Sequence, residues 1–307
     1  MSKLGSHPAE VPEGSALQGA AMVLAAGACW SLAGLFVRAM EGADAWQILV
    51  YRSAATLVFT LLLLAQRGGG SPWPAVRALG WKGPLAGSAL ACAMLSFVLA
   101  LATTAVFDVV MMLCIAPLMA ALLGRLLLGE RVRRVTLLAM LIAVVGVAVM
   151  VWAGLELGSL VGLLLSLAAP FCFAVFTVTL RAAKVQDTLP AVAWAGAIGC
   201  LVSLIVVLAE GRSPVISLHD TLLALAMGSL QIGIGMWFFT AGAKRLSAAE
   251  ATLLSLSEVV LAPIWVWLAF DEVPTRTTLV GGSILLGAMV LQAASGLRRR
   301  RPPLGLA

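Results

Sequence analysis

Long apolar runs separated by short polar breaks occupy nearly the whole sequence. Ten of these runs are each long enough to cross about 30 Å of hydrocarbon as a helix. They cover approximately residues 18–38, 44–66, 81–103, 107–128, 133–152, 157–180, 189–209, 219–243, 248–271 and 275–296. No polar break is long enough to fold as a soluble domain. The pattern therefore predicts an all-α integral membrane protein with ten transmembrane helices.

The composition agrees with this pattern and narrows the function. Of the 307 residues, 62% are apolar and 11% are charged. Soluble domains contain roughly 45–50% apolar and roughly 25% charged residues. Because almost every segment is predicted to be intramembrane, the protein must act within or across the lipid bilayer. This favours transport of a small-molecule substrate.

The positions of Lys and Arg predict the orientation in the membrane. If both termini are cytoplasmic, 15 of these residues fall in cytoplasmic segments and three fall outside, namely Arg38, Arg212 and Arg276. We therefore expect a multi-pass protein of the cell inner membrane, with cytoplasmic tails at residues 1–17 and 297–307. This topology accounts for the net charge of +6, so no nucleic-acid partner is needed.

The sequence lacks the residues that several classes of function require. The chain has two histidines, no GxxxxGK[ST] loop, and five cysteines that fall inside predicted helices without CxxC spacing. We therefore expect no metal site, no cofactor and no enzymatic activity. An integral-membrane lipid-modifying enzyme is the rival outside transport, but it would place clustered His, Asp or Glu at the membrane edge, where this sequence has isolated acids.

The sequence matches itself when it is shifted by 142 or 143 positions. The matched residues are Gly19 with Gly162, Cys29 with Cys172, Arg38 with Arg181, Asp44 with Asp187, Asp108 with Glu250, Glu130 with Glu272, and Arg134 with Arg276. Each half, 18–152 and 157–296, contains five predicted helices. An odd number inserts the second copy upside down relative to the first, which predicts two inverted five-helix repeats around a central cavity.

Four sequence blocks carry a family resemblance. The first half contains "AAGACWSLAGLFVR", "LVYRSAA" and "APLMAALLGRLLLGERV", and the second half repeats the last block as "SEVVLAPIWVWLAFDEVPT". Each half resembles an EamA domain of the drug/metabolite transporter superfamily, over roughly residues 18–296. The resemblance implies a ten-helix secondary transporter, commonly an exporter of amino acids, other metabolites or toxic compounds, and often proton-coupled.

One position departs from this family pattern. Many members have Glu-Pro in the ninth helix, whereas here Val259 follows Glu258, and the aligned proline occurs only in the first half, as Pro117. A proline-induced break is therefore expected in the fourth helix. In the ninth helix only Pro263 could produce one.

Glu258 is the main candidate for a functional residue. It is the only charge between Glu250 and Asp271 and falls near the middle of the ninth run. A charge at that depth costs roughly 2.5–3.5 kcal/mol, so the side chain should face the interior of the bundle. It can serve as a proton-coupling carboxylate or as a ligand for a substrate amine. The alternative is a neutral Glu that is hydrogen-bonded to another helix for packing alone.

Arg52 is the second intramembrane charge to explain. It falls about two turns into the second run. It can bind a substrate carboxylate, or it can reach the interface or bond to backbone carbonyls of another helix. The sequence leaves open whether it pairs with Asp108 or with Glu258.

Five further residues are candidates for a substrate cavity. Trp30 and Ser31 fall at mid-depth in the first helix, and Phe173 occupies the position equivalent to Trp30 in the second half. Gln231 is a polar residue near the middle of the eighth helix, and Met111 offers an adaptable surface. Aromatic rings in a cavity wall can hold cations or stack on substrates, but the same residues are equally suited to core packing.

The remaining acids are read as structural. Asp108 and Glu250 are predicted to stabilise helix N-termini, and Glu130 and Glu272 are predicted to anchor loops at the ends of equivalent helices. No cluster of acids suggests catalysis.

These observations lead to one functional prediction. We expect a secondary transporter, a monomer or homodimer, that exports small organic metabolites such as amino acids, related compounds or drugs by alternating access. Proton coupling or exchange is expected at Glu258. An uptake carrier or an uncoupled facilitator of the same fold is the alternative.

Overall fold

The structure is a computed structural model that describes residues 13–297, apart from residues 131, 133, 157–159, 186 and 247. The expected cytoplasmic tails at 1–17 and 297–307 therefore lie almost entirely outside the described residues.

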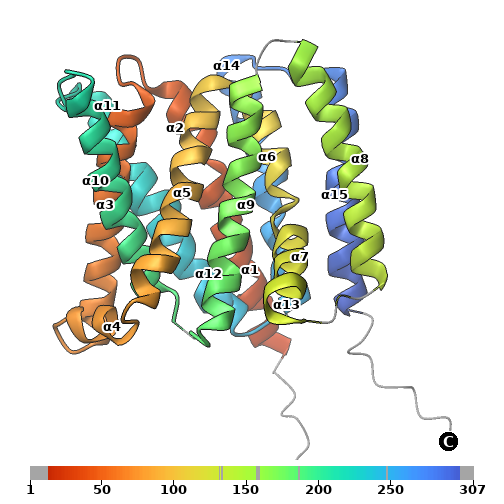
Figure 1. The fold of residues 1–307 in the computed structure, drawn as a ribbon, viewed down its shortest axis with the longest axis horizontal. Coiled ribbons are helices and arrows are strands. Elements are labelled where there is room, and N and C mark those ends of the chain that lie inside the picture. The colour runs from red at the N-terminus through yellow and green to blue at the C-terminus, as the bar shows by residue number, and fades with distance from the viewer. Residues whose placement is uncertain are drawn as a thin grey trace, which may run out of the picture.

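The described chain is all-helical, with fifteen α-helices and one π-helix (Figure 1). In chain order these are α1 (Glu13–Ser31), α2 (Ala33–Ala39), α3 (Ala45–Arg67), α4 (Trp73–Ala78), α5 (Lys82–Thr103), α6 (Val106–Leu113), α7 (Ala116–Leu128), α8 (Arg134–Glu156), α9 (Leu160–Ala182), α10 (Leu189–Ala209), α11 (Leu218–Ala226), η1 (Met227–Ile234), α12 (Gly235–Ala243), α13 (Ala248–Ser255), α14 (Ser257–Phe270) and α15 (Arg276–Leu297). Below, the upper end is the end of the bundle in Figure 1 where α11 begins, and the lower end is the one where α4 lies.

Eight segments of the described chain are long and apolar enough to cross a membrane. They are Leu17–Ala39, Ala45–Arg67, Lys82–Thr103, Val106–Leu128, Leu160–Ala182, Leu189–Ala209, Leu218–Ala243 and Arg276–Ala294. Two shorter apolar segments, Arg134–Met150 of helix α8 and Ser257–Phe270, which is helix α14, accompany them. The all-helical membrane class is thus confirmed, and the predicted count of ten depends on whether these two shorter segments also cross.

The two halves repeat each other in the positions of their elements. The first membrane span of each half ends at Ala39 and at Ala182, two positions that are offset by 143. Helices α6 and α13 begin at Val106 and Ala248 and end at Leu113 and Ser255, so both ends are offset by 142. The spacing found in the sequence therefore recurs in the boundaries of the helices.

Both halves have a helix break, and the break in the second half does not come from a proline. Helix α6 ends at Leu113 before α7 begins, and α13 ends at Ser255 before α14 begins, so both halves are broken at equivalent positions. Pro263 lies inside α14 without interrupting it. The second break is closed by a short turn in which the Val259 N–H donates to the Leu256 carbonyl at 3.0 Å. A proline is therefore not required for this break.

Helices of one half pack against the broken helices of the other. Helix α1 contacts α12, α13 and α14, while α9 contacts α5, α6 and α7. Large apolar side chains such as Leu126, Leu141 and Trp152 are exposed on the bundle, as expected for a surface covered by hydrocarbon.

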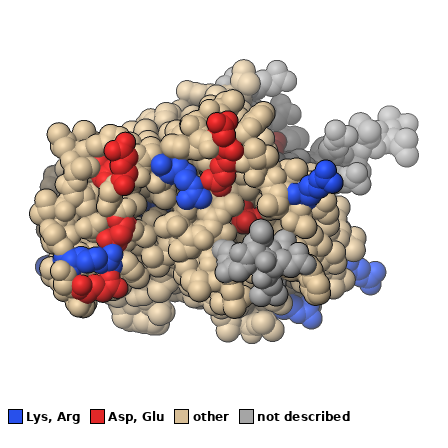
Figure 2. All heavy atoms as spheres, turned by 90° about the horizontal axis from the view of Figure 1, so that it is seen from above, with Lys and Arg blue, Asp and Glu red and all other residues tan. Residues whose placement is uncertain are grey.

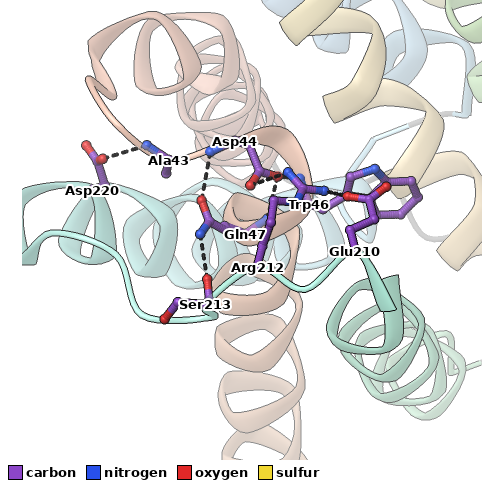
Figure 3. Close-up of polar contacts among 8 residues, drawn as sticks. All are labelled: Ala43, Asp44, Trp46, Gln47, Glu210, Arg212, Ser213 and Asp220. Atoms are coloured by element: carbon purple, nitrogen blue, oxygen red, sulfur yellow. Dashed lines mark hydrogen bonds and ion pairs between the residues drawn. The ribbon is translucent and has the colours of Figure 1, made fainter. Parts of the chain in front are cut away.

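Buried Asp220 holds the upper loop between α2 and α3. Its carboxylate accepts the backbone N–H groups of Glu41, Gly42 and Ala43 at 3.1, 3.0 and 2.9 Å. These three donors have no partner in a helix, so one side chain satisfies all of them. Figure 3 shows Asp220 reaching this loop from the start of α11.

A second set of polar contacts stabilises the N-terminus of α3, beside that loop. Asp44 accepts the N–H groups of Trp46 and Gln47, and the Gln47 side chain accepts the Asp44 N–H in return, which forms a capping box. Arg212 binds Asp44 at 2.6 Å and also binds Glu210 (Figure 3). Figure 2 looks onto this upper end and shows acidic and basic side chains lying close together on it.

Replacing Asp220 with Ala is expected to destabilise the protein. The substitution leaves three backbone N–H groups without their acceptor, which costs roughly 1–3 kcal/mol. Thermal unfolding in detergent should show a lower melting temperature. Asp187→Ala is the matched control, because Asp187 is exposed and accepts one N–H, from Leu189. Equal melting temperatures for the two variants would contradict the role given to Asp220.

Candidate functional site

The two helix breaks lie near each other in the interior of the bundle. Helices α6 and α14 are in contact, and Cys114, in the break between α6 and α7, is close enough to Glu258 for electrostatic interaction. Broken helices leave backbone groups available at mid-membrane depth, where transporters of inverted repeats bind their substrates. The region around Glu258 is therefore the candidate site.

Glu258 lies in the first turn of α14 and is half-buried. Within the described residues it has no hydrogen bond and no ion pair. Its position favours a carboxylate locally, because the N-terminal end of a helix carries partial positive charge. The side chain thus keeps its capacity to bind a proton or a cationic group.

Gly27 lets α1 approach α14 at the level of Glu258. A Cβ atom at Gly27 would collide with the Ser257 hydroxyl and lie 3.3 Å from the Glu258 nitrogen. One turn further along α1, the Ser31 hydroxyl accepts a hydrogen bond from Trp265 Nε1 at 2.9 Å and donates to the Ala28 carbonyl at 2.7 Å. Ser31 is fully buried, so the structure places this predicted site residue in the α1–α14 contact.

Trp30 and Gln231 meet on another face of α1. The Trp30 ring lies 5.3 Å from the ring of Phe239 and packs over Gly235. Gln231 Nε2 donates to the Trp30 carbonyl at 3.4 Å, and Gln231 Oε1 is buried without a partner. Gln231 belongs to η1, and π-helical turns occur frequently at functional sites.

Arg52 is buried with few partners. Its side chain is 1% exposed, and the hydrogen bond that it makes, from Nη1 to the Met94 carbonyl, is long at 3.4 Å. Its Nε has no partner, and no carboxylate lies within ion-pair distance among the described residues. The structure therefore pairs Arg52 with neither Asp108 nor Glu258.

Asp108 lies in the first turn of α6, as predicted, but it makes no capping hydrogen bond there. Its carboxylate accepts a hydrogen bond from the Thr278 hydroxyl at 2.8 Å, which joins α6 to α15. The N-terminus of α6 is instead served by Glu272, which accepts the Val106 N–H at 2.7 Å. The cap of this helix therefore comes from the other half of the chain.

Met111 and Phe173 do not join the residues around Glu258. Met111 packs against Gly282 of α15. Phe173 is 42% exposed and contacts Phe176 of its own helix at 5.8 Å between ring centroids. The predicted equivalence of Phe173 and Trp30 therefore holds in sequence position but not in environment.

Arg38 and Glu272 form an ion pair at the upper end of the bundle. Arg38 Nε donates to Glu272 at 2.8 Å, and its other nitrogens donate to the carbonyls of Leu101 and Thr104 at 2.8 and 2.9 Å. Glu272 also accepts the Val106 N–H. The pair joins the first crossing segment of one half to the loop that follows α14 in the other.

An equivalent pair joins Arg181 and Glu130. Arg181 Nη1 binds Glu130 at 2.9 Å, and Nη2 donates to the Ala120 carbonyl at 2.8 Å. Arg181 and Glu130 are the repeat partners of Arg38 and Glu272. The sequence aligned these residues, but it gave no indication that the arginine of each half binds the glutamate of the other.

Comparison with known proteins identifies the family. The sequence pattern of the EamA-like transporter family matches residues 17–152 and again residues 160–293. A protein named as a pseudopaline exporter, from Pseudomonas aeruginosa, is 25% identical over 248 residues, which cover 80% of this chain and 84% of that relative. A protein named as a probable terminal-alkyne amino-acid exporter, from Streptantibioticus cattleyicolor, is 27% identical over 197 residues, covering 62% and 65% of the two chains.

A solved crystal structure has the same fold. It covers 92% of this chain and 99% of its own chain, with a TM-score of 0.62 and 17% sequence identity. At this identity the likeness concerns the fold alone.

Replacing Gly27 with Val is expected to separate α1 from α14. The added atoms have no space beside Ser257, and overpacking of this kind costs typically about 1–3 kcal/mol. We expect a lower melting temperature and slower transport. Gly287→Val is the control, because a Cβ at Gly287 would meet nothing within 4 Å. The close approach would be refuted by a Gly27→Val protein that is as stable and as active as the control.

Proposed function

The chain belongs to the EamA-like transporter family, whose pattern covers both halves, and on this basis we propose that it exports amino acids or related small metabolites across the inner membrane. Two relatives are named as exporters, and one of those names specifies an amino acid. These names support both the outward direction and the substrate class.

The observation that carries the proposal is Glu258 at the break before α14. A carboxylate surrounded by apolar helices is costly unless it binds a proton or a cation. Glu258 has no such partner among the described residues. A substrate ammonium group or a proton would neutralise the carboxylate. Because the two compete for Glu258, transport of the substrate is coupled to transport of protons in the opposite direction.

Arg52 supplies the complementary charge. Its guanidinium is buried and has no carboxylate partner in the described chain. Arginine binds carboxylates through paired N–H groups. A substrate that carries both an ammonium and a carboxylate group, as an amino acid does, would satisfy Glu258 and Arg52 together. Ser257 Oγ and Gln231 Oε1 are also buried without partners, so they add polar groups for the rest of the substrate.

Alternating access follows from the repeat. We propose that the two shorter apolar segments complete ten crossings, so that each half has five and the second half is inverted. The shared helix boundaries, the paired breaks and the two repeated ion pairs support this arrangement. In the proposal, the Arg38–Glu272 pair closes the upper end and the Arg181–Glu130 pair closes the lower end, and each pair separates when its own end opens.

Uptake and uncoupled diffusion are the alternatives within transport. Exchange kinetics in proteoliposomes, measured with and without a proton gradient, separate the three mechanisms. A coupled exporter is driven by the gradient, whereas an uncoupled facilitator only equilibrates its substrate.

Replacing Glu258 with Gln is expected to abolish the pH dependence of transport and to slow it by about tenfold or more. The reason is that an amide can neither carry a proton nor pair with an ammonium group, and a charge-assisted bond contributes about 1.5–3 kcal/mol. The substrate to use is the compound that most raises the melting temperature in a screen of amino acids, nucleosides and polyamines. Glu41→Gln is the control, because Glu41 is exposed. An unchanged rate and pH profile would remove Glu258 from the coupling role.

Breaking the two ion pairs separately is expected to open opposite ends. Cys114 is 2% exposed and lies near Glu258, so it can report access to the site once the other four cysteines are replaced. Glu272→Gln should increase its labelling by an impermeant maleimide from one side of the membrane, and Glu130→Gln from the other. Labelling that rises from the same side in both variants would contradict alternating access.

A further inference from the structure

A surface hollow lies at the lower end of the bundle, away from the breaks. It has a volume of about 530 Å³ and is formed by α4 and the start of α5 on one side and the loop between α9 and α10 on the other. The first element belongs to the first half of the chain and the second to the other half. This end is the one expected to be cytoplasmic.

Three cations line the hollow, namely Arg77, Lys82 and Lys184. None of them forms an ion pair among the described residues. The lining contains one carboxylate, Asp187, which already faces Arg67 at 4.0 Å. The hollow therefore has an excess of positive charge that the described protein does not neutralise.

Lys184 is held in an unusual backbone conformation. Its φ is 53°, a left-handed value that is normally occupied by glycine at the end of a helix. The turn after α9 imposes it, through bonds from the Lys184 N–H to the Arg181 carbonyl at 3.0 Å and from the Val185 N–H to the Leu180 carbonyl at 3.0 Å. A lysine here is strained by its backbone, yet its side chain contributes charge to the hollow.

Two exposed tryptophans place the hollow at the membrane surface. Trp73 begins α4 and Trp81 precedes α5, and they are 57% and 73% exposed. Val76 is the buried residue of α4, so this short helix lies on the bundle with little of itself inside. Tryptophan concentrates at the level of lipid headgroups. The cations of the hollow therefore lie near the depth of the lipid phosphates.

We propose that Arg77, Lys82 and Lys184, which together we call the basic hollow, bind the phosphate of an anionic phospholipid headgroup. Arginine binds phosphate through paired N–H groups and lysine binds it as a point charge. The volume lies within the range of small-ligand pockets, about 300–1,000 Å³. The bound lipid links the α4–α5 segment of the first half to the α9–α10 loop of the second.

The flanking tryptophans identify the source of the phosphate as lipid. A free phosphate ion needs only the cations, whereas a lipid also needs acyl chains to reach hydrocarbon beside the site. Trp73 and Trp81 place the site at that boundary. The alternative is that the three cations only set the orientation of the protein in the membrane. In that case, any three basic residues at this end would contribute equally to the orientation.

The test compares two triple variants of the full chain in phosphatidylcholine nanodiscs with increasing phosphatidylglycerol. Arg77→Gln/Lys82→Gln/Lys184→Gln removes the basic hollow. Arg125→Gln/Arg134→Gln/Lys244→Gln removes three exposed charges from the same end of the bundle. Native mass spectrometry counts bound lipid, and thermal unfolding gives the stabilisation. The wild type should be stabilised by phosphatidylglycerol, and the first triple should bind it at least about tenfold more weakly, while the second triple should match the wild type.

Two further measurements test the proposal even if the Arg77→Gln/Lys82→Gln/Lys184→Gln variant folds poorly. Lys184→Gly relieves the left-handed strain, so it should be more stable than the wild type in pure phosphatidylcholine and still bind phosphatidylglycerol more weakly. Inorganic phosphate and glycerol phosphate, added alone, should not reproduce the stabilisation. The proposal is overturned if both triples lose lipid equally, if Lys184→Gly binds lipid as the wild type does, or if inorganic phosphate stabilises as well as the lipid.

Discussion

Hydrocarbon supplies no hydrogen bonds, so every polar group inside this bundle must find its partner within the chain or in a bound molecule. Most of the described polar groups meet that requirement. Asp220 satisfies three N–H groups of one loop, and Arg38 makes three hydrogen bonds, one to Glu272. Exceptions include the unpartnered Ser257 Oγ and Gln231 Oε1, and above all Glu258 and Arg52, since neither has a charged partner among the described residues. The proposed site for a substrate with both charges therefore follows from the same constraint that assembles the rest of the fold.

The two halves share their helix breaks and helix ends, but they differ in the residue that carries the candidate chemistry. Both halves break the same helix at equivalent positions, and α7 and α14 both end at a left-handed residue, Gly129 and Asp271, with φ values of 67° and 52°. Helix α7, however, begins with Ala116, whereas the equivalent residue in the first turn of α14 is Glu258. Both halves therefore have the same broken-helix arrangement, and only the second half carries a carboxylate, Glu258, at this position.

Much of this arrangement could be predicted from the sequence, and the failures have physical causes. Hydrophobic length and the 142-residue offset predicted the helical class and the equivalence of Glu130 with Glu272. They could not predict which arginine each glutamate binds, because sequence fixes the depth of a residue but not the direction it faces around its helix. For the same reason the sequence does not identify Trp265 as the partner of Ser31. Phe173 was matched to Trp30 by position, but its helix turns it outward to an exposed surface.

The two ion pairs that join the halves are not equally strong, and this difference bears on direction. Arg38 and Glu272 are 27% and 20% exposed, and besides the bond between them they form three hydrogen bonds with their surroundings. Arg181 and Glu130 are 41% and 39% exposed, and besides the bond between them Arg181 forms one hydrogen bond, to the Ala120 carbonyl. Exposed pairs are more easily broken, because water and salt compete for both charges. In the proposed cycle the lower end, which is expected to be cytoplasmic, therefore opens at the smaller cost. A carrier that opens first toward the cytoplasm loads its substrate there, which is the order that export requires.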